Sequence, residues 1–330
     1  MSTVGNERVD VDVPATMEVT ALETFGSPDV LKTQRAQVPE PGPTKVLIAI
    51  HAAGVGVWDL LMRDGSWQPC DIDAPPGVLG TDGAGVVVKV GSQVKRFAVG
   101  DRVFGYGFGG FYAEYTVVDE SRVGLIPEHM SYAEAAAAAV PGLTDLQGLI
   151  DILKLSAGQI ALVVGASGAL GTLAIQFAKA LRARVLASAS GTDAKDLVLR
   201  LGTDGVFDTR RKDGLDQLRQ LAPTGVDAAL ILGAGSVLEQ CLDLVRPGGS
   251  IAYPYGVNPE PRPRDRVRVV GYNLEAGPKD LDRMTRLSHE AYLRVPIAQT
   301  YALADASEAH KRLEKGHVLG RVILQTRLAT

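Results

Sequence analysis

Two patterns of hydrophobic and polar positions divide the chain near Ser131. Before it, short apolar runs such as residues 46–51 and 78–90 are separated by glycine and proline, which is typical of strands in a compact β-structure. After it, apolar runs of strand length alternate with segments whose apolar residues recur at helical spacing. This alternation predicts a parallel, doubly wound sheet. We therefore expect an α/β protein in which that sheet accompanies a partly open β-barrel.

The predicted elements after Ser131 follow a regular order. Ser131, with Glu134 three residues later, predicts the start of a helix. This helix is expected to break at Pro141-Gly142 and to resume over 143–153. Strands separated by helices are predicted at residues 160–164, 184–187, 205–207, 226–232 and 250–253, followed by helices at 280–292 and 304–315 and a strand at 321–324.

The stretch over residues 160–179 suggests a nucleotide site. A buried strand is followed by Gly165, Gly168 and Gly171 and then by a helix. Glycines let the backbone approach a pyrophosphate, and the helix N-terminus offers free N–H groups. The spacing departs from the common G-x-G-x-x-G, and a glycine that only lets a helix pack close to a strand is the structural alternative. The sequence has no nucleophile elbow and no P-loop, which excludes those two site types.

Composition narrows the class of protein. The chain has 330 residues, 46% hydrophobic and 22% charged, with a net charge of −4, as in an ordinary globular protein of about two domains. No basic stripe indicates a nucleic-acid partner and no apolar segment indicates a membrane partner. Two distant cysteines, Cys70 and Cys241, fit a reducing compartment. We expect a cytoplasmic protein whose residues 1–16 form a flexible leader.

A set of short stretches recurs in a specific order along the chain: residues 51–55, 79–85, 99–103, 112–115, 135–139 with 142–144, 165–171, 247–249 and 316–321. Together they resemble the quinone oxidoreductase branch of the medium-chain dehydrogenase/reductase superfamily, over residues 17–327. The resemblance implies a Rossmann dinucleotide-binding domain over 138–284, inserted in a GroES-like catalytic domain over 17–137 and 285–330. It also implies a homodimer joined through the edges of the cofactor sheets.

The resemblance also bears on metal binding. Zinc-dependent members use a cysteine that falls here in residues 55–58, and a His-Glu pair that falls on Thr81-Asp82. Many members also have a lobe with four cysteines, which this chain cannot form. The five histidines do not cluster, and zinc needs three or four nitrogen, sulfur or carboxylate ligands. We therefore expect no metal.

The cofactor is expected to be NADP(H). An acid at the end of the second cofactor strand would favour NAD, and this chain has Ser188 and Ser190 there, with Lys195 beyond. Lys195 as an ordinary surface residue is the alternative. The resemblance places Thr144 at the nicotinamide, and the pyrophosphate and nicotinamide ribose at two further groups of residues. These are Gly165, Ala166, Ser167, Gly168, Ala169 and Leu170 for the first, and Leu232, Gly233, Ala234, Tyr253 and Tyr255 for the second.

Direct hydride delivery to a quinone or an α,β-unsaturated carbonyl compound is the chemistry that this resemblance implies. Gly56, where many relatives have asparagine, and Ile231, where many have aspartate, depart from the family. The expected substrate pocket consists of Gly56 and the aromatic residues Trp58, Trp67, Tyr106 and Phe108, whose alternative is to fill the barrel core. No convincing general acid is found; Asp59 and Tyr112 are the candidates, and structural hydrogen bonding is the alternative for Asp59.

Two other readings stay open. The same scaffold could serve a natural-product biosynthetic enone or enoyl reductase. It could also be a nucleotide-binding protein without turnover, which the departures at Gly56 and Ile231 allow. A short-chain dehydrogenase is excluded, because no Tyr-x-x-x-Lys occurs in the chain.

Overall fold

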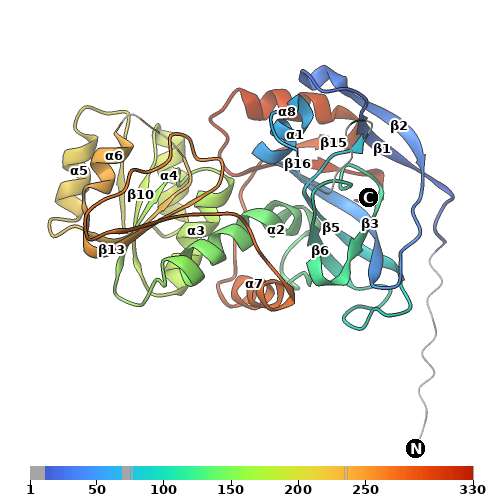
Figure 1. Cartoon of the computed structure of the whole chain (residues 1–330), viewed down its shortest axis with the longest axis horizontal. Coiled ribbons are helices and arrows are strands. Elements are labelled where there is room, and N and C mark those ends of the chain that lie inside the picture. The colour runs from blue at the N-terminus through green and yellow to red at the C-terminus, as the bar shows by residue number, and fades with distance from the viewer. Residues whose placement is uncertain (1–11, 69–74, 76, 234, 236, 330) are drawn as a thin grey trace, which may run out of the picture.

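A six-stranded parallel sheet forms one lobe of the molecule, on the left in Figure 1. The computed structural model describes residues 12–68, 75, 77–233, 235 and 237–329. The strand order β11-β10-β9-β12-β13-β14 is that of a doubly wound sheet, which confirms the predicted fold class. The strands are β9 (Ile160–Val164), β10 (Arg184–Ser188), β11 (Gly205–Phe207), β12 (Val226–Ile231), β13 (Val245–Pro254) and β14 (Arg268–Tyr272).

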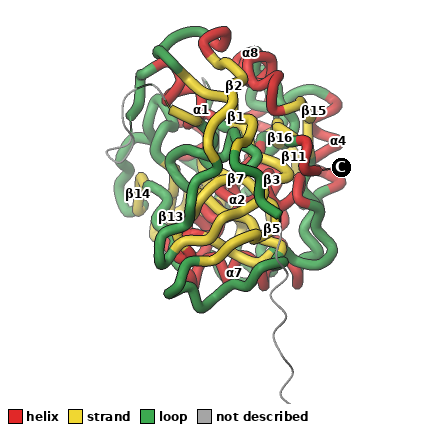
Figure 2. The backbone as a smooth tube through the Cα atoms, turned by 90° about the vertical axis from the view of Figure 1, so that its right-hand side faces the viewer, coloured by secondary structure: helices red, strands yellow, loops and turns green. Residues whose placement is uncertain are grey.

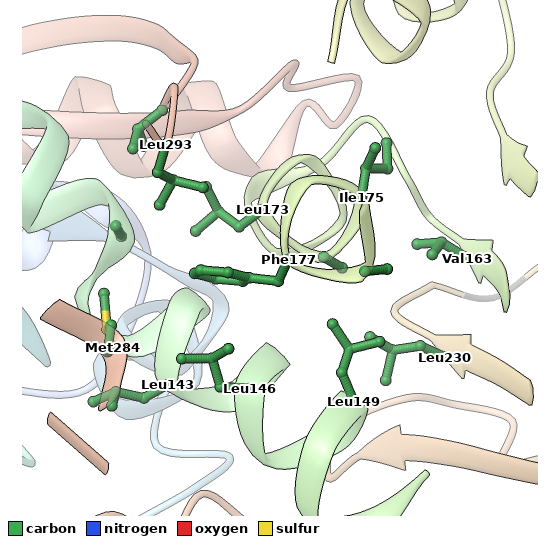
Figure 3. Packing of buried hydrophobic residues seen from close by; sticks show 14 of the residues in the cluster. Leu143, Leu146, Leu149, Val163, Leu173, Ile175, Phe177, Leu230, Met284 and Leu293 are labelled. Atoms are coloured by element: carbon green, nitrogen blue, oxygen red, sulfur yellow. The ribbon is translucent and has the colours of Figure 1, made fainter. Parts of the chain in front are cut away.

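Helices cover both faces of this sheet. They are α3 (Ala169–Ala180), α4 (Thr192–Arg200), α5 (Gly214–Leu221) and α6 (Leu238–Leu242). Leu173 and Phe177 of α3 are fully buried, and they belong to a hydrophobic cluster that includes residues of α2 and α7. Figure 3 shows Phe177 among Leu143, Leu146 and Met284, which come from other helices. This core fixes the position of α3, and therefore of the glycine turn that precedes it.

The second lobe is the β-barrel. One sheet has the order β15-β16-β3-β5-β6-β8, with β7 paired to β3, and a smaller sheet has the order β2-β1-β4. In Figure 2, β3, β5 and β7 lie side by side beneath β1 and β2. The elements are β1 (Thr16–Leu22), β2 (Leu31–Gln37), β3 (Lys45–Val55), α1 (Val57–Asp64), β4 (Gly77–Val78), β5 (Asp82–Val90), β6 (Arg102–Tyr106), β7 (Tyr115–Asp119), β8 (Val123–Leu125), β15 (Ile297–Ala302), α8 (Ala306–Glu314) and β16 (Arg321–Gln325).

Two helices lie between the lobes (Figure 1): α2 (Tyr132–Leu146) and α7 (Pro278–Glu290). The predicted capping box is present, because the Ser131 hydroxyl accepts a hydrogen bond from the Glu134 backbone N–H and the Glu134 carboxylate accepts one from the Ser131 N–H. Residues 135–139 are alanines buried against the barrel strands and α3. Their small side chains let the helix approach both lobes closely.

The predicted break at Pro141 was wrong. The helix α2 continues through Pro141 to Leu146 and passes directly into a π-helical turn over Gln147–Ile152. The N–H of Val140 donates to the Asp82 carboxylate of the barrel at 3.1 Å. Because packing on both sides holds the helix, it tolerates a proline that would end an isolated helix.

Several elements were not predicted, among them β2, β8, α1 and β14. The helix α1 has eight residues between Gly56 and Gly65, too short for a clear helical period. The strand β14 follows the basic loop over 259–268 and lies at the edge of its sheet. Among the described residues, no helix is both long enough and apolar enough to cross a membrane.

Candidate functional site

A cavity of about 500 Å³ lies between the two lobes. Its walls on the sheet side come from the residues that follow β9, β12 and β13, which are the carboxyl ends of neighbouring parallel strands. The barrel supplies the end of β3, the start of α1 and residues near β16. A cleft at the point where the strand order reverses is the usual ligand site of a doubly wound sheet.

The glycine turn at the cavity has two glycines that the fold itself requires. Gly165 has a φ of +81°, and a Cβ at Gly171 would lie 2.3 Å from the Gly165 carbonyl oxygen. Gly168 differs, because its φ is −80° and the nearest atom to a Cβ there is 3.6 Å away. The protein alone gives no reason for glycine at 168, and the open space beside it suits a ligand that approaches the backbone.

The helix α3 begins at this open position. Its N-cap is Gly168 and no side chain caps its first turn, so the N–H groups at the start of the helix are available to an anion. Two contacts hold the turn in place. The Gly165 N–H donates to the Ser188 hydroxyl at 3.0 Å, and the Gly320 N–H donates to the Ser167 carbonyl at 3.0 Å. The residues present therefore fit a dinucleotide pyrophosphate.

The structure brings most of the predicted cofactor residues together. Those that line the cavity are Thr144, Gly165, Gly168, Ala169, Leu170, Leu232, Gly233 and Tyr255. Ala166 is fully buried behind the turn, and Ser188 supports Gly165 rather than lining the cavity. Tyr253 is also outside the cavity lining, because its hydroxyl donates to Glu260 at 3.1 Å. Ala234 lies outside the described residues.

Ser190 and Lys195 converge on an acid that the sequence analysis missed. The Ser190 hydroxyl donates to Asp208 at 2.6 Å, and the Lys195 ammonium lies 3.3 Å from the other oxygen of the same carboxylate. Burial raises the Asp208 pKa, but the hydrogen bonds from Ser190, the Arg210 N–H and Lys195 outweigh it and lower the pKa overall. Asp208 follows β11, which pairs with β10. The pairing of β11 with β10 brings Asp208 beside Ser190, and a motif of neighbouring residues does not contain this contact.

The predicted aromatic lining divides into two parts. Trp58 lines the cavity, and its ring stacks on Tyr255 with centroids 5.9 Å apart and planes at 6°. Trp67 packs on Trp58 at 4.7 Å and reaches Phe108 at 6.3 Å. Tyr106 and Phe108 instead line a separate cavity of about 770 Å³ on the barrel. The prediction of one aromatic pocket in loops was therefore wrong, since Trp58 lies on α1 and Tyr106 ends β6.

The two candidate acids, Asp59 and Tyr112, have no surface in the cavity. Asp59 is fully buried and accepts hydrogen bonds from the Gly56 N–H at 2.7 Å and the Thr81 N–H at 3.0 Å. Burial, with the neighbouring Asp82 carboxylate, raises its pKa to about 7. The Tyr112 hydroxyl lies 3.0 Å from His310, and burial raises its pKa well above the usual value. Their contacts correspond to structural hydrogen bonding, the alternative kept open for Asp59.

A buried ion pair involves Asp82, one of the two residues on which the resemblance placed the His-Glu pair of zinc-dependent members. Arg321 Nη2 donates to Asp82 Oδ1 at 2.8 Å, beside Gly56 and Thr81. Asp82 also accepts from Val140, so its oxygens are already bonded. Within the described part of the chain, no three His, Cys, Asp or Glu side chains are placed to hold a metal ion. These residues do not fit a zinc ion.

Comparison with known proteins identifies the class to which this fold and site belong. Residues 42–128 match the alcohol dehydrogenase GroES-like domain, and residues 201–324 match the zinc-binding dehydrogenase domain. The chain therefore belongs to the medium-chain dehydrogenase/reductase superfamily, as predicted, and is an oxidoreductase of that family with a site for a nicotinamide cofactor.

Within the superfamily, the chain belongs to the quinone oxidoreductase branch. It is 31% identical to the quinone oxidoreductase of Sus scrofa over 300 residues, which are 87% of this chain and 91% of that protein. It is 35% identical to 2-methylene-furan-3-one reductase of Solanum lycopersicum over 326 residues, 95% of this chain and 80% of that protein. The structure of an NAD-dependent alcohol dehydrogenase is similar, with a TM-score of 0.85 at 30% identity, over 94% of this chain and 99% of that one.

Proposed function

We propose that this protein is an NADPH-dependent reductase that delivers hydride to a quinone or an α,β-unsaturated carbonyl compound without zinc. The open backbone at Gly168, at the start of an uncapped helix, is the observation that supports it most directly. When bound, the reduced nicotinamide supplies the hydride. The chain's own residues bind the pyrophosphate at the glycine turn, and Thr144 and the neighbouring apolar groups shape a restricted space for the acceptor.

The metal-free part of the proposal is supported by the donor groups near Gly56. The Asp82 carboxylate is paired with Arg321, and Asp59 is bonded to two backbone N–H groups. Neither a thiol nor an imidazole lines the described part of the cavity. A protein dialysed against a strong chelator should therefore keep its full rate of reduction, and loss of activity that added zinc restores would contradict this part.

The preference for NADPH is supported by Ser190 and Lys195, which lie together beyond β10. Asp208 offsets part of the Lys195 charge in the structure. A 2′-phosphate would have to compete with this carboxylate for the ammonium and the Ser190 hydroxyl. We therefore expect a moderate rather than an absolute preference over NADH.

The reaction is tested by measuring NADPH oxidation with a panel of quinones and enones. The relative from Solanum lycopersicum is named for an enone-type substrate, which favours including small furanones and chain-extended enones beside benzoquinones. Selective reduction of one elaborate enone would favour the biosynthetic alternative. NADPH binding without oxidation in the presence of any acceptor would favour the non-catalytic alternative and contradict the proposal.

We also propose a homodimer joined through β14. This strand forms one edge of the six-stranded sheet, and an edge strand has backbone groups free to pair with another chain. Val269 and Val270 on it are only half-buried in the single chain. Light scattering after size-exclusion chromatography should give twice the 34.8 kDa of one chain. Monomers at micromolar concentration would contradict the assembly.

A further inference from the structure

We propose that Arg321 binds the carbonyl oxygen of the acceptor and stabilises the negative charge that forms there during reduction. This inference rests on the proposed function and names the group that would replace a metal in it. It assigns Arg321 a catalytic contact with the substrate, rather than the purely structural role that its ion pair with Asp82 alone would suggest.

The position of the guanidinium is the first part of the argument. Arg321 begins β16, is only 6% exposed, and lies in the cavity wall with Gly56 and Thr81. Thr144, the residue expected at the nicotinamide, lines the same cavity. The cation is therefore buried at the barrel wall of the cavity that also contains the glycine turn.

The hydrogen-bonding capacity of Arg321 is the second part. A guanidinium has five N–H donors. Among the described residues, its only hydrogen-bond partner is Asp82, which Nη2 contacts, and Nε is buried without a partner. Nη1 has no partner in the described part of the chain either. A cation this deeply buried with donors left over is costly unless a ligand satisfies it.

Two glycines, Gly54 in β3 and Gly56 at the N-cap of α1, leave room for this arrangement. A Cβ at Gly54 would lie 2.3 Å from Asp82 Oδ1 and 2.7 Å from Arg321 Nη2. A Cβ at Gly56 would lie 3.1 Å from Nη2 and 3.2 Å from Nη1, against the face of the guanidinium. Gly54 therefore admits the ion pair, and Gly56 keeps the guanidinium accessible from the cavity. The space that the guanidinium needs therefore explains why this chain has glycine at position 56.

The charges around Arg321 favour an anionic oxygen. Asp82 balances the cation, and burial raises the pKa of both Asp82 and Asp59. Tyr112 and His310 pack behind this pair as neutral groups, because burial raises the pKa of Tyr112 and lowers that of His310. Arg63, a second buried cation nearby, contacts His310 Nδ1 at 3.5 Å, whereas Arg321 is the arginine that is hydrogen-bonded to Asp82.

The reaction needs a hydrogen-bond donor at the carbonyl oxygen while hydride is transferred. When hydride forms a C–H bond at the electron-poor carbon of an enone, the π electrons shift and leave negative charge on the carbonyl oxygen. A proton from water then adds to the α-carbon and regenerates the carbonyl. A charge-assisted hydrogen bond from Arg321 strengthens as that charge grows, so it lowers the barrier rather than only binding the substrate.

The test compares variants that preserve charge balance. Arg321→Met alone would leave Asp82 buried and unpaired, so Arg321→Met is combined with Asp82→Asn. The matched control is Arg63→Met with Glu314→Gln, because this second ion pair of the barrel has an arginine that is only 4% exposed and no member in the cavity lining. Circular dichroism and urea unfolding establish that both double variants fold, and Arg321→Lys serves as a conservative variant.

The measurements are kcat for cinnamaldehyde, the Kd of NADPH, and the Kd of cinnamate, whose carboxylate mimics the charged oxygen. The Arg321→Met/Asp82→Asn variant should lose about 100-fold in kcat and about tenfold in cinnamate affinity, with the NADPH Kd unchanged. Arg321→Lys should recover part of both losses, and the Arg63 control should lose neither.

Three results separate the possible failures. Equal cinnamate affinity and kcat in the variant and the wild type would overturn the proposal. A parallel loss of NADPH affinity would assign Arg321 to the cofactor pyrophosphate and overturn it as well. If the wild type reduces no acceptor at all, the proposed function fails, and cinnamate binding still decides whether Arg321 holds an oxyanion.

Discussion

A carboxylate at position 168 should affect folding and cofactor binding in opposite directions. Gly168 is the N-cap of α3, and its extended backbone accepts any side chain with no close contact in the protein. Aspartate is a preferred N-cap residue, so Gly168→Asp should stabilise the protein without ligand by a few tenths of a kcal/mol. The same carboxylate would face a bound pyrophosphate.

The size of the loss follows from electrostatics. Two unit charges about 5 Å apart interact by about 3 kcal/mol at an effective dielectric constant of 20. One such repulsion corresponds to a loss of roughly 100-fold in affinity, and a pyrophosphate has two charges. Gly168→Asp should therefore weaken NADPH binding by roughly 100-fold or more, although the fold is intact.

Gly168→Asn is the matched control, because it has nearly the same shape and capping ability without the charge. NADPH affinity is measured by fluorescence titration, and stability by urea unfolding without ligand. The asparagine variant should lose much less affinity than the aspartate variant. If a folded Gly168→Asp variant binds NADPH as tightly as the wild type, the assignment of the glycine turn is refuted.

Three further changes test the structure independently. Lys195→Glu should weaken NADPH roughly tenfold or more beyond any effect on NADH, and equal losses for both would exclude a 2′-phosphate role. Burial raises the pKa of Asp59 to about 7 in the folded protein, from a reference of 3.8. The folded state therefore holds this proton over a pH range in which the unfolded state has lost it, and the free energy of unfolding should fall as pH rises between these two values. Asp59→Asn should make that fall shallower when it is measured by urea unfolding at several pH values, and an unchanged slope would contradict the raised pKa. Gly171→Ala would place a Cβ 2.3 Å from the Gly165 oxygen and should cost about 1–3 kcal/mol of stability, whereas unchanged unfolding would show that the helix can shift freely.

The alternation of strands and helices could be predicted because local periodicity determines it. Residues 160–179 gave a strand, a turn and a helix at nearly their observed bounds. The strand β14 and the continuous helix α2 could not be predicted, since tertiary contacts decide them. Val140 bonds to Asp82 of the barrel across the lobes, and no local rule for proline includes that contact.

The candidate site also has a part that the sequence predicted and a part that depends on tertiary contacts. The glycine turn is a contiguous segment, so its sequence indicated it. Asp208 and Arg321 join the site from distant segments, through strand pairing in one case and a buried ion pair in the other. Tyr106 and Phe108 were predicted to share a pocket with Trp58 because all three were expected in glycine-punctuated loops of the barrel, but they line a separate cavity.

The hydrogen bond from Gly320 to Ser167 joins the segment before β16 to the turn after β9, and a short bridge pairs Gly320 with Gly168. A chimera that exchanged the barrel of this chain for that of a relative would therefore replace residues that contact the glycine turn. Residues 316–321 would have to be kept from the same parent protein as the glycine turn. The segment suited to recombination therefore includes residues from both lobes.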